Sequence, residues 1–187
     1  MGNGSVDLRV RLTKKLLKEA LIQSLKTQHI SEITVRALCE KAGINRSTFY
    51  SHYASPSVLL KSIEDEVMEN INIYLEKKEY MVDKHPSVQG IVPILEYVKE
   101  NADIFNVLFS ENCDLDFPKN VLALSQIIFF NLNPKYDEKT RDYIAIFGLS
   151  GCISVLQKWL KSGTVETPEE ISEFFYQVLY RGIVSFT

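Results

Sequence analysis

Apolar residues recur at every third or fourth position along most of this chain, which is the spacing of amphipathic helices. No segment alternates apolar and polar residues with a period of two between turn residues, so the pattern indicates no sheet. It predicts an all-α fold of nine helices, over residues 8–27, 35–42, 46–52, 56–80, 87–101, 103–111, 116–132, 137–162 and 168–186.

The second and third of these helices are short and lie within the stretch TVRALCEKAGINRSTFYSHY. Thr34 is a suitable cap for the first of them, and Gly43 can end it because glycine readily adopts the left-handed conformation of a helix C-terminus. Asn45 is a suitable cap for the second. Phe49 and Tyr53, spaced four apart, would fasten that helix to the body of the domain. The spacing predicts a helix-turn-helix, a motif that places its second helix in a DNA groove.

The exposed side of the second short helix carries side chains that hydrogen-bond to phosphates or base edges, namely Arg46, Ser47, Thr48, Tyr50 and His52. Arg46 is the strongest candidate, because a guanidinium binds guanine through two hydrogen bonds. The alternative for Arg46 is an exposed cation on a short helix. For Tyr50 the alternatives are a hydroxyl that reaches phosphate and a ring that only packs. This set of polar residues favours a protein that binds DNA over an enzyme.

The net charge of −3 is divided unevenly along the chain. Residues 1–54 contain nine Lys and Arg against four Asp and Glu, a balance of +5. Residues 55–187 contain twelve against twenty, a balance of −8. A positive N-terminal part is expected where one domain meets phosphate and the other does not. Charge scattered by chance over a solvated surface would not explain why the excess coincides with the helix-turn-helix.

The sequence shows no pattern of catalytic or metal-binding residues. Cys39, Cys113 and Cys152 are scattered without CxxC spacing, and the three His are dispersed, which predicts neither a disulfide nor a metal site. No Ser/His/Asp order, carboxylate pair or Gly-rich phosphate loop indicates an enzyme or a cofactor. The acidic residues 64–66 and 69 are expected on the solvated side of the fourth helix.

The N-terminal segment MGNGSVDLRVRL lacks the apolar core of a signal peptide. No apolar run approaches the length of about 18 residues that spans a membrane. The scattered cysteines agree with a reducing compartment. These features predict a cytoplasmic protein with no membrane segment.

Three helices followed by a long fourth, with TVRALCEKAGINRSTFYSHY in the second and third, resemble the TetR family of bacterial transcriptional regulators. Further along, FGLSGCISVLQKWLKSG (147–163) and TPEEISEFFYQVL (167–179) are similar to the C-terminal domain of regulators from Firmicutes. The resemblance implies a nine-helix fold with two parts. Residues 8–68 would form a three-helix DNA-binding head whose motif spans about 34–53, and residues 69–187 a larger helical domain for dimerisation and ligand binding.

The same resemblance implies what the protein does. A homodimer would place its two third helices in major grooves of a palindromic operator, about 34–36 Å apart or somewhat more. The C-terminal domain would form the dimer and, in many members, enclose an apolar pocket whose ligand shifts the spacing of the two heads. This implies a ligand-responsive repressor without a cofactor, whose partners are double-stranded DNA, a second copy of itself and a small apolar effector. The alternative is a TetR-like co-activator or interaction protein that senses a partner protein.

The resemblance extends the candidate DNA contacts to both short helices. The full set is Thr34, Arg36, Asn45, Arg46, Ser47, Thr48, Tyr50 and His52. Thr34 and Asn45 have the alternative of serving only as caps. Family members usually carry a lysine near the start of the fourth helix that holds phosphate, where this chain has Ala54-Ser55-Pro56-Ser57. We expect that contact either to be lost or to be made by a hydroxyl or a backbone N–H, with somewhat weaker non-specific affinity as the consequence.

In the C-terminal domain, two glycines three apart on an apolar helix suggest close helix approach at the dimer interface, with local flexibility or ligand access as the alternative. The candidate interface residues are Gly148, Gly151, Trp159, Phe174 and Phe175. Aromatic residues at helical spacing either line an effector pocket or form plain core. The candidates for the pocket are Phe105, Phe109, Phe129 and Phe147.

Overall fold

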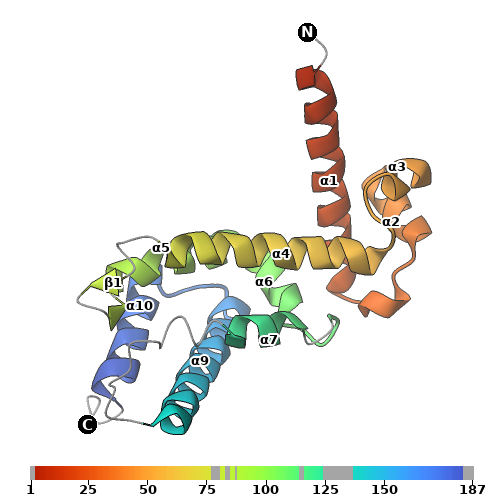
Figure 1. Ribbon diagram of the computed structural model, residues 1–187. Coiled ribbons are helices and arrows are strands. Elements are labelled where there is room, and N and C mark those ends of the chain that lie inside the picture. The colour runs from red at the N-terminus through yellow and green to blue at the C-terminus, as the bar shows by residue number, and fades with distance from the viewer. Residues whose placement is uncertain are drawn as a thin grey trace. The chain divides into compact units, whose positions relative to one another are not determined.

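A computed structural model describes residues 3–76, 81–82, 85–86, 88–113, 116–123 and 137–182 of the chain. Within these ranges the chain is helical except for two short strands (Figure 1). It forms two compact units. The first holds residues up to 67 together with 107–115, and the second holds residues 68–106 together with those from 116 onward. The sequence-based boundary after residue 68 did not assign the segment 107–115 to the first unit.

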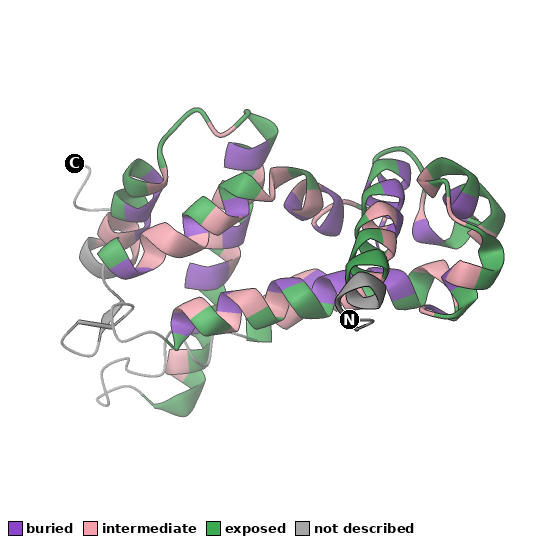
Figure 2. Cartoon of the chain, turned by 90° about the horizontal axis from the view of Figure 1, so that it is seen from above, coloured by how far each residue is buried: buried purple, intermediate pink, exposed green. Residues whose placement is uncertain are grey.

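The first unit contains the predicted helix-turn-helix. Its elements are α1 (Asn3–Leu25), the 3₁₀ helix η1 (Ile30–Glu32), α2 (Val35–Ala42), α3 (Arg46–Tyr50) and the first part of α4 (Pro56–Leu75). The sides of α1, α2 and α3 that face one another are buried (Figure 2). The core residues without exposed surface include Leu17, Leu21, Leu38, Phe49 and Leu59. The apolar residues at helical spacing therefore pack into one core beneath the motif.

Asn112 ties the corner between α1 and η1 to the segment that follows α6 (Ala102–Leu108). Its side-chain amide donates a hydrogen bond to the carbonyl of Leu25 at 2.8 Å. Its own carbonyl accepts from the backbone N–H of Ile30 at 2.9 Å. Asn112 thus satisfies a carbonyl at the end of one helix and an N–H at the start of the next, groups that a helix leaves unpaired at its ends.

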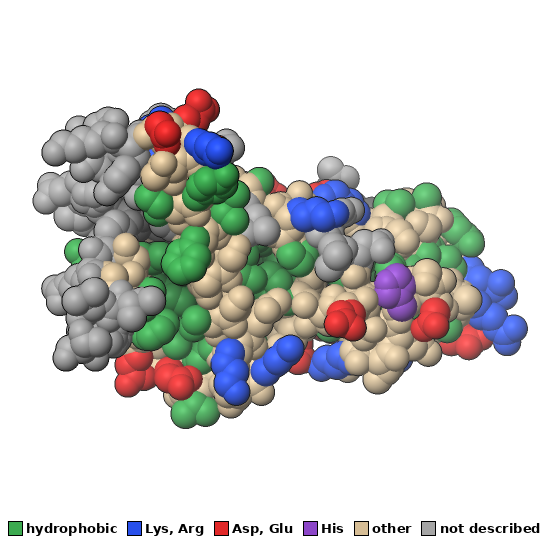
Figure 3. All heavy atoms as spheres, turned by 90° about the horizontal axis from the view of Figure 1, so that it is seen from below, with side chains coloured by type: hydrophobic (Ala, Val, Ile, Leu, Met, Phe, Trp, Pro, Cys, Tyr) green, Lys and Arg blue, Asp and Glu red, His purple; other side chains and the backbone are tan. Residues whose placement is uncertain are grey.

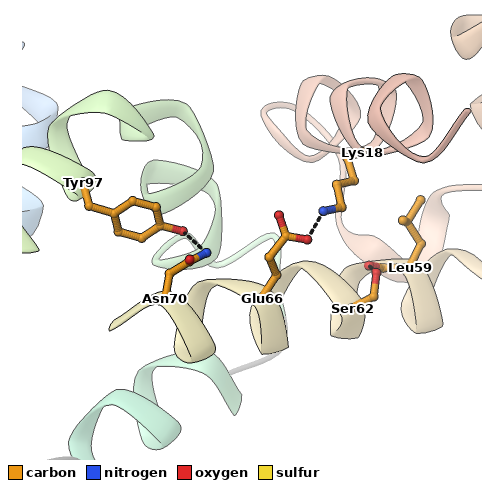
Figure 4. A network of polar contacts seen from close by, with 6 residues as sticks. All are labelled: Lys18, Leu59, Ser62, Glu66, Asn70 and Tyr97. Atoms are coloured by element: carbon orange, nitrogen blue, oxygen red, sulfur yellow. Dashed lines mark hydrogen bonds and ion pairs between the residues drawn. The ribbon is translucent and has the colours of Figure 1, made fainter. Parts of the chain in front are cut away.

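The acidic residues of α4 are not all solvated, contrary to the sequence-based expectation. Glu64 is only 4% exposed, and its carboxylate lies 3.7 Å from Lys61 Nζ. Glu66 forms an ion pair with Lys18 of α1 (Figure 4). Glu64 lies four positions after Leu60 and three before Val67, so it shares the buried face of α4, whereas Glu66 keeps 58% of its side-chain surface exposed.

The second unit is built from the last part of α4 and the helices that follow it. These are most of α6 together with α5 (Val88–Glu100), α7 (Asp116–Ala123), α9 (Glu138–Lys161), α10 (Pro168–Tyr176) and the π-helix η3 (Gln177–Arg181). Ser172 on α10 is fully buried, and its hydroxyl donates to the carbonyl of Val88 at the start of α5 at 2.7 Å. The predicted helix start at Pro168 is confirmed by a capping box between Thr167 and Glu170.

An aromatic cluster fills the centre of this second unit. Phe105 packs against Tyr97 and Phe117, with ring centroids 5.8 and 6.2 Å away. The hydroxyl of Tyr97 accepts a hydrogen bond from the Asn70 amide at 3.2 Å (Figure 4). Phe105 and Phe117 are almost completely buried, so this cluster is packed core.

Two features of the second unit differ from the sequence-based prediction. Strands β1 (Met81–Val82) and β2 (His85–Pro86) pair antiparallel, although no sheet was predicted. Two-residue strands are too short to produce a detectable period of two. The last predicted helix, 168–186, changes to π-type hydrogen bonding at Gln177, and Gly182 follows with a positive φ of 74°. The predicted helix over 116–132 is described only as far as Ala123.

Candidate nucleic-acid interface

The first helix of the motif begins and ends as its sequence predicts. Thr34 caps α2, because its hydroxyl accepts a hydrogen bond from the backbone N–H of Ala37 at 3.2 Å. Gly43 ends the helix with φ 65° and ψ 30°, the left-handed conformation that costs glycine least. The N–H of Ile44 then returns to the Cys39 carbonyl at 3.0 Å. These local hydrogen bonds fix the turn that aims the second helix.

The second helix, α3, is shorter than predicted and ends at Tyr50 instead of His52. Asn45 caps it: its Oδ1 accepts from the Ser47 N–H at 3.1 Å and from the Ser47 hydroxyl at 3.2 Å. Phe49 is fully buried, and its ring centroid lies 6.0 Å from that of Tyr53. The predicted aromatic anchor between these two residues is therefore present.

The eight candidate DNA contacts all retain exposed surface. Thr34, Arg36, Asn45, Arg46, Ser47 and Tyr50 are exposed, whereas Thr48 and His52 are half-buried. Tyr50 contacts Phe49 edge-on at 5.6 Å between centroids but remains 59% exposed. The ring of Tyr50 is therefore largely available to a ligand, and packing against Phe49 uses only part of its surface.

Three of these candidates surround one hollow at the turn between α2 and α3. Arg36, Asn45 and Arg46 line a volume of about 420 Å³ together with Cys39, Glu40, Gly43 and Ile44. Ser47, Thr48, Tyr50 and His52 lie outside this lining. Two guanidinium groups and an amide around one concave surface form a site that suits phosphate or a guanine edge.

The floor of the hollow is chemically inert. Burial raises the pKa of the Cys39 thiol, and the nearby Arg46 guanidinium lowers it by a smaller amount. The thiol is therefore protonated at neutral pH, and Cys39 acts as a small packing residue.

Sequence reasoning missed Glu40, which lines the same hollow. The Nε of Arg36 donates to Glu40 Oε1 at 2.9 Å, and this carboxylate raises the pKa of Arg36. Both side chains are exposed. The spacing of four residues within one helix was the available signal, because residues i and i+4 are neighbours on a helix surface.

A second concave surface lies between α9 and α10 in the second unit. This groove has a volume of about 650 Å³, and its lining includes Phe147, Gly148, Gly151, Phe174 and Phe175. Phe147 is 76% exposed and Phe174 is 40% exposed. Hydrophobic side chains gather over these helices in the left part of Figure 3. The groove unites four of the five candidate interface residues.

The remaining C-terminal candidates lie apart from one another. Trp159 is 2% exposed, and its indole N–H donates to the Glu166 carbonyl at 3.0 Å, so it serves the core of its own protomer. Phe147 lies in the groove and Phe105 in the buried aromatic cluster. Phe109 belongs to the first unit, and Phe129 lies outside the described residues. The four pocket candidates therefore do not form one cluster in the part of the chain that is described.

More than half of the chain matches a known protein family. Residues 87–181, just over half of it, match the family model of a transcriptional regulator C-terminal region of the TetR type. The chain is a TetR-family transcriptional regulator. The helix-turn-helix of its first unit and the predominantly helical second unit both agree with this family.

The relatives of this TetR-family regulator include other transcriptional regulators. It is 25% identical over 169 residues to the uncharacterized HTH-type transcriptional regulator YxbF of Bacillus subtilis, covering 87% of this chain and 43% of the relative. The chain thus spans less than half the length of that relative. A TetR transcriptional regulator from Streptococcus agalactiae matches at 25% identity with a TM-score of 0.66, covering 94% of this chain and 97% of the other.

The fold is also shared with a more distant protein. NalD, the secondary repressor of the MexAB-OprM multidrug efflux pump in Pseudomonas aeruginosa, has a TM-score of 0.64 at 16% identity, covering 92% of this chain and 97% of the other. TetR-family regulators bind DNA, dimerise and often bind small-molecule effectors, and they are not enzymes. In the described residues no three His, Cys, Asp or Glu side chains are grouped as metal ligands would be.

One helix of this TetR-family regulator departs from the expectation that no segment could span a membrane. By length and composition alone α9 is apolar enough to do so, and only a third of the relevant window is buried. TetR-family regulators are soluble DNA-binding proteins. An apolar surface that a chain leaves exposed marks a site of interaction with a protein, a membrane or a ligand.

Proposed function

We propose that this chain is a ligand-responsive repressor that binds a palindromic operator as a homodimer in the cytoplasm. The observation that carries the proposal is the exposed polar surface of α2 and α3, where Arg36, Asn45 and Arg46 surround one hollow. Repression is proposed because NalD, which shares the fold, is a repressor.

The homodimer is supported by the groove between α9 and α10. Groove residues Ile144, Gly148, Gly151 and Val155 follow one another at steps of four, three and four residues, so they form one stripe along α9, with Phe147 beside it. A Cβ at Gly151 would meet no heavy atom within 4 Å in its own protomer. An apolar stripe with a small residue at its centre suits the close approach of the same stripe from a second copy, as a two-fold interface requires.

The effector is proposed to be a small apolar molecule bound in the second unit. Apolar side chains dominate the buried residues of that unit, and sites for such ligands are lined mainly by apolar side chains. Because α10 packs on α5 through the buried Ser172, a ligand that shifted either helix would disturb the other. This supports a binding event in the second unit that changes its packing.

The proposal is tested by selecting duplexes from a random-sequence pool with the wild-type protein and sequencing them. We expect a two-fold symmetric consensus and two protomers per bound duplex in analytical ultracentrifugation. Arg46→Ala should weaken binding to the selected duplex by about 5- to 150-fold, the range for one lost bidentate base contact. Lys15→Ala, which removes an exposed cation of α1 outside the motif, is the matched control.

Two results would contradict the proposal. One is the absence of any enriched sequence, together with Arg46→Ala binding that equals wild type. The other is recovery of the protein in a stable complex with a different protein and no duplex, which would favour the co-activator or interaction protein considered from the sequence.

A further inference from the structure

Glu40 carries a negative charge on a surface that is proposed to bind DNA. It is the only acidic residue in the motif from Thr34 to Tyr53, which also contains Arg36, Lys41 and Arg46. It lines the same hollow as the two arginines. A carboxylate on a surface that meets phosphate is repelled by its ligand. Electrostatic attraction to DNA therefore cannot be what this side chain contributes.

The ion pair that Glu40 forms is also poorly arranged for helix stability. Arg36 is the second residue of α2, and its Nε donates to Glu40 Oε1 at 2.9 Å. An acidic residue that precedes its basic partner by four positions stabilises a helix better than the reverse order found here. The cation lies at the positive end of the helix dipole and the anion toward its negative end, so both oppose it. With both side chains exposed, solvent and salt also weaken the pair.

The pair does have a clear effect on the arginine. A carboxylate that accepts from Nε fixes the plane of the guanidinium, and this plane decides which acceptors the remaining N–H groups can reach. Arg36 is thereby held at the rim of the hollow that Asn45 and Arg46 complete. The carboxylate also adds a negative charge to the hollow that both guanidinium groups line.

We propose that Glu40 is a specificity-determining residue of the DNA interface, which orients Arg36 and repels phosphate so that the hollow favours base edges over the DNA backbone. This inference rests on the DNA-binding function proposed above. On unrelated DNA the arginines find mainly phosphate oxygens, and the carboxylate opposes that contact. On the matching site guanine offers two acceptors in the plane of the guanidinium, which compensate for the repulsion.

We expect that removing the charge of Glu40 strengthens binding to unrelated DNA more than binding to the selected duplex. Glu40→Gln keeps the size of the side chain and a hydrogen-bond acceptor. We expect it to bind an unrelated duplex of equal composition about threefold to tenfold more tightly than wild type at low salt. Its affinity for the duplex selected by wild type should change by a smaller factor, so the ratio of the two affinities falls.

The matched control is Glu19→Gln. Glu19 is the acidic partner of Lys15 in the same order and spacing on α1, 3.8 Å apart and equally exposed to solvent, in the same unit but outside the motif. Glu19→Gln should leave the affinity ratio unchanged. Glu40→Asp retains the charge and should keep unrelated DNA at wild-type affinity.

Both duplexes are measured by fluorescence anisotropy at three salt concentrations. A Glu40→Gln protein whose two affinities shift by the same factor, or an unrelated duplex that it binds no better than wild type, would overturn the role of Glu40. Glu40→Asp that behaves as Glu40→Gln would overturn it as well. A wild-type protein that binds neither duplex would instead overturn the proposed function, and this result appears before any variant is made.

Discussion

Replacing Gly151 by leucine should affect the stability of the protomer and the association of two protomers in opposite directions. Gly151 lies in the middle of α9, is exposed, and has no heavy atom within 4 Å of the position that a Cβ would take. An added Cβ therefore meets open space, and the rest of the leucine side chain extends over the exposed groove. Glycine is about 0.8–1.0 kcal/mol less favourable than alanine inside a helix, and leucine is close to alanine. The isolated protomer should become slightly more stable.

The dimer should respond in the opposite direction. If Gly151 allows two copies of α9 to approach closely, a two-fold axis brings both added side chains into the same contact. Overpacking a well-packed apolar contact costs about 1–3 kcal/mol for each insertion. Two insertions give about 2–6 kcal/mol, and each 1.4 kcal/mol weakens an equilibrium about tenfold. We therefore expect the dimer Kd to rise by at least about 30-fold.

Sedimentation equilibrium over a range of protein concentrations measures this Kd, and thermal unfolding monitors the fold. Lys161→Leu is the control, because it adds a leucine to the exposed end of the same helix outside the groove. Association of Gly151→Leu as tight as that of wild type would refute the α9–α10 interface. A loss of helical signal would refute the claim that the protomer leaves this position open.

Three further predictions follow from individual contacts. Asn112→Ala removes the amide that holds the Leu25 carbonyl, and should lower the free energy of unfolding by about 1–3 kcal/mol in urea titrations; an unchanged midpoint would contradict this. Ser57→Lys adds a cation at the exposed start of α4, and should steepen the dependence of log K on log salt by about 0.9; an equal slope would show that no phosphate lies there. The double variant Arg36→Glu/Glu40→Arg aligns both charges with the helix dipole, so it should raise Tm in calorimetry while losing affinity for the selected duplex. A lower Tm would contradict the dipole argument.

The helix-turn-helix could be predicted from the sequence because its determinants are local. The caps by Thr34 and Asn45 each join a side chain to a backbone group two or three residues away. Gly43 ends α2 through its own conformation. Such contacts do not depend on the rest of the fold, so the residue types at fixed spacing are sufficient to indicate them.

Features that depend on tertiary packing could not be predicted in this way. Asn112 contacts Leu25 across 87 positions in the chain, and nothing in the sequence near either residue indicates this. Aromatic spacing likewise could not separate Phe147, which is exposed on the groove, from Phe105, which is buried in the core. Periodicity predicts which face of a helix is apolar, but not whether that face meets its own chain or a second one.

Hydroxyl-radical footprinting of the wild-type protein on its selected duplex tests whether a dimer recognises DNA through the α2–α3 surface. We expect two protected patches on one face of the duplex, about one helical turn or somewhat more apart, one for each α3 of the dimer. Protection of guanine N7 from methylation within each patch should disappear in Arg46→Ala. A single patch, or protection that does not depend on Arg46, would contradict recognition by a dimer through the α2–α3 surface.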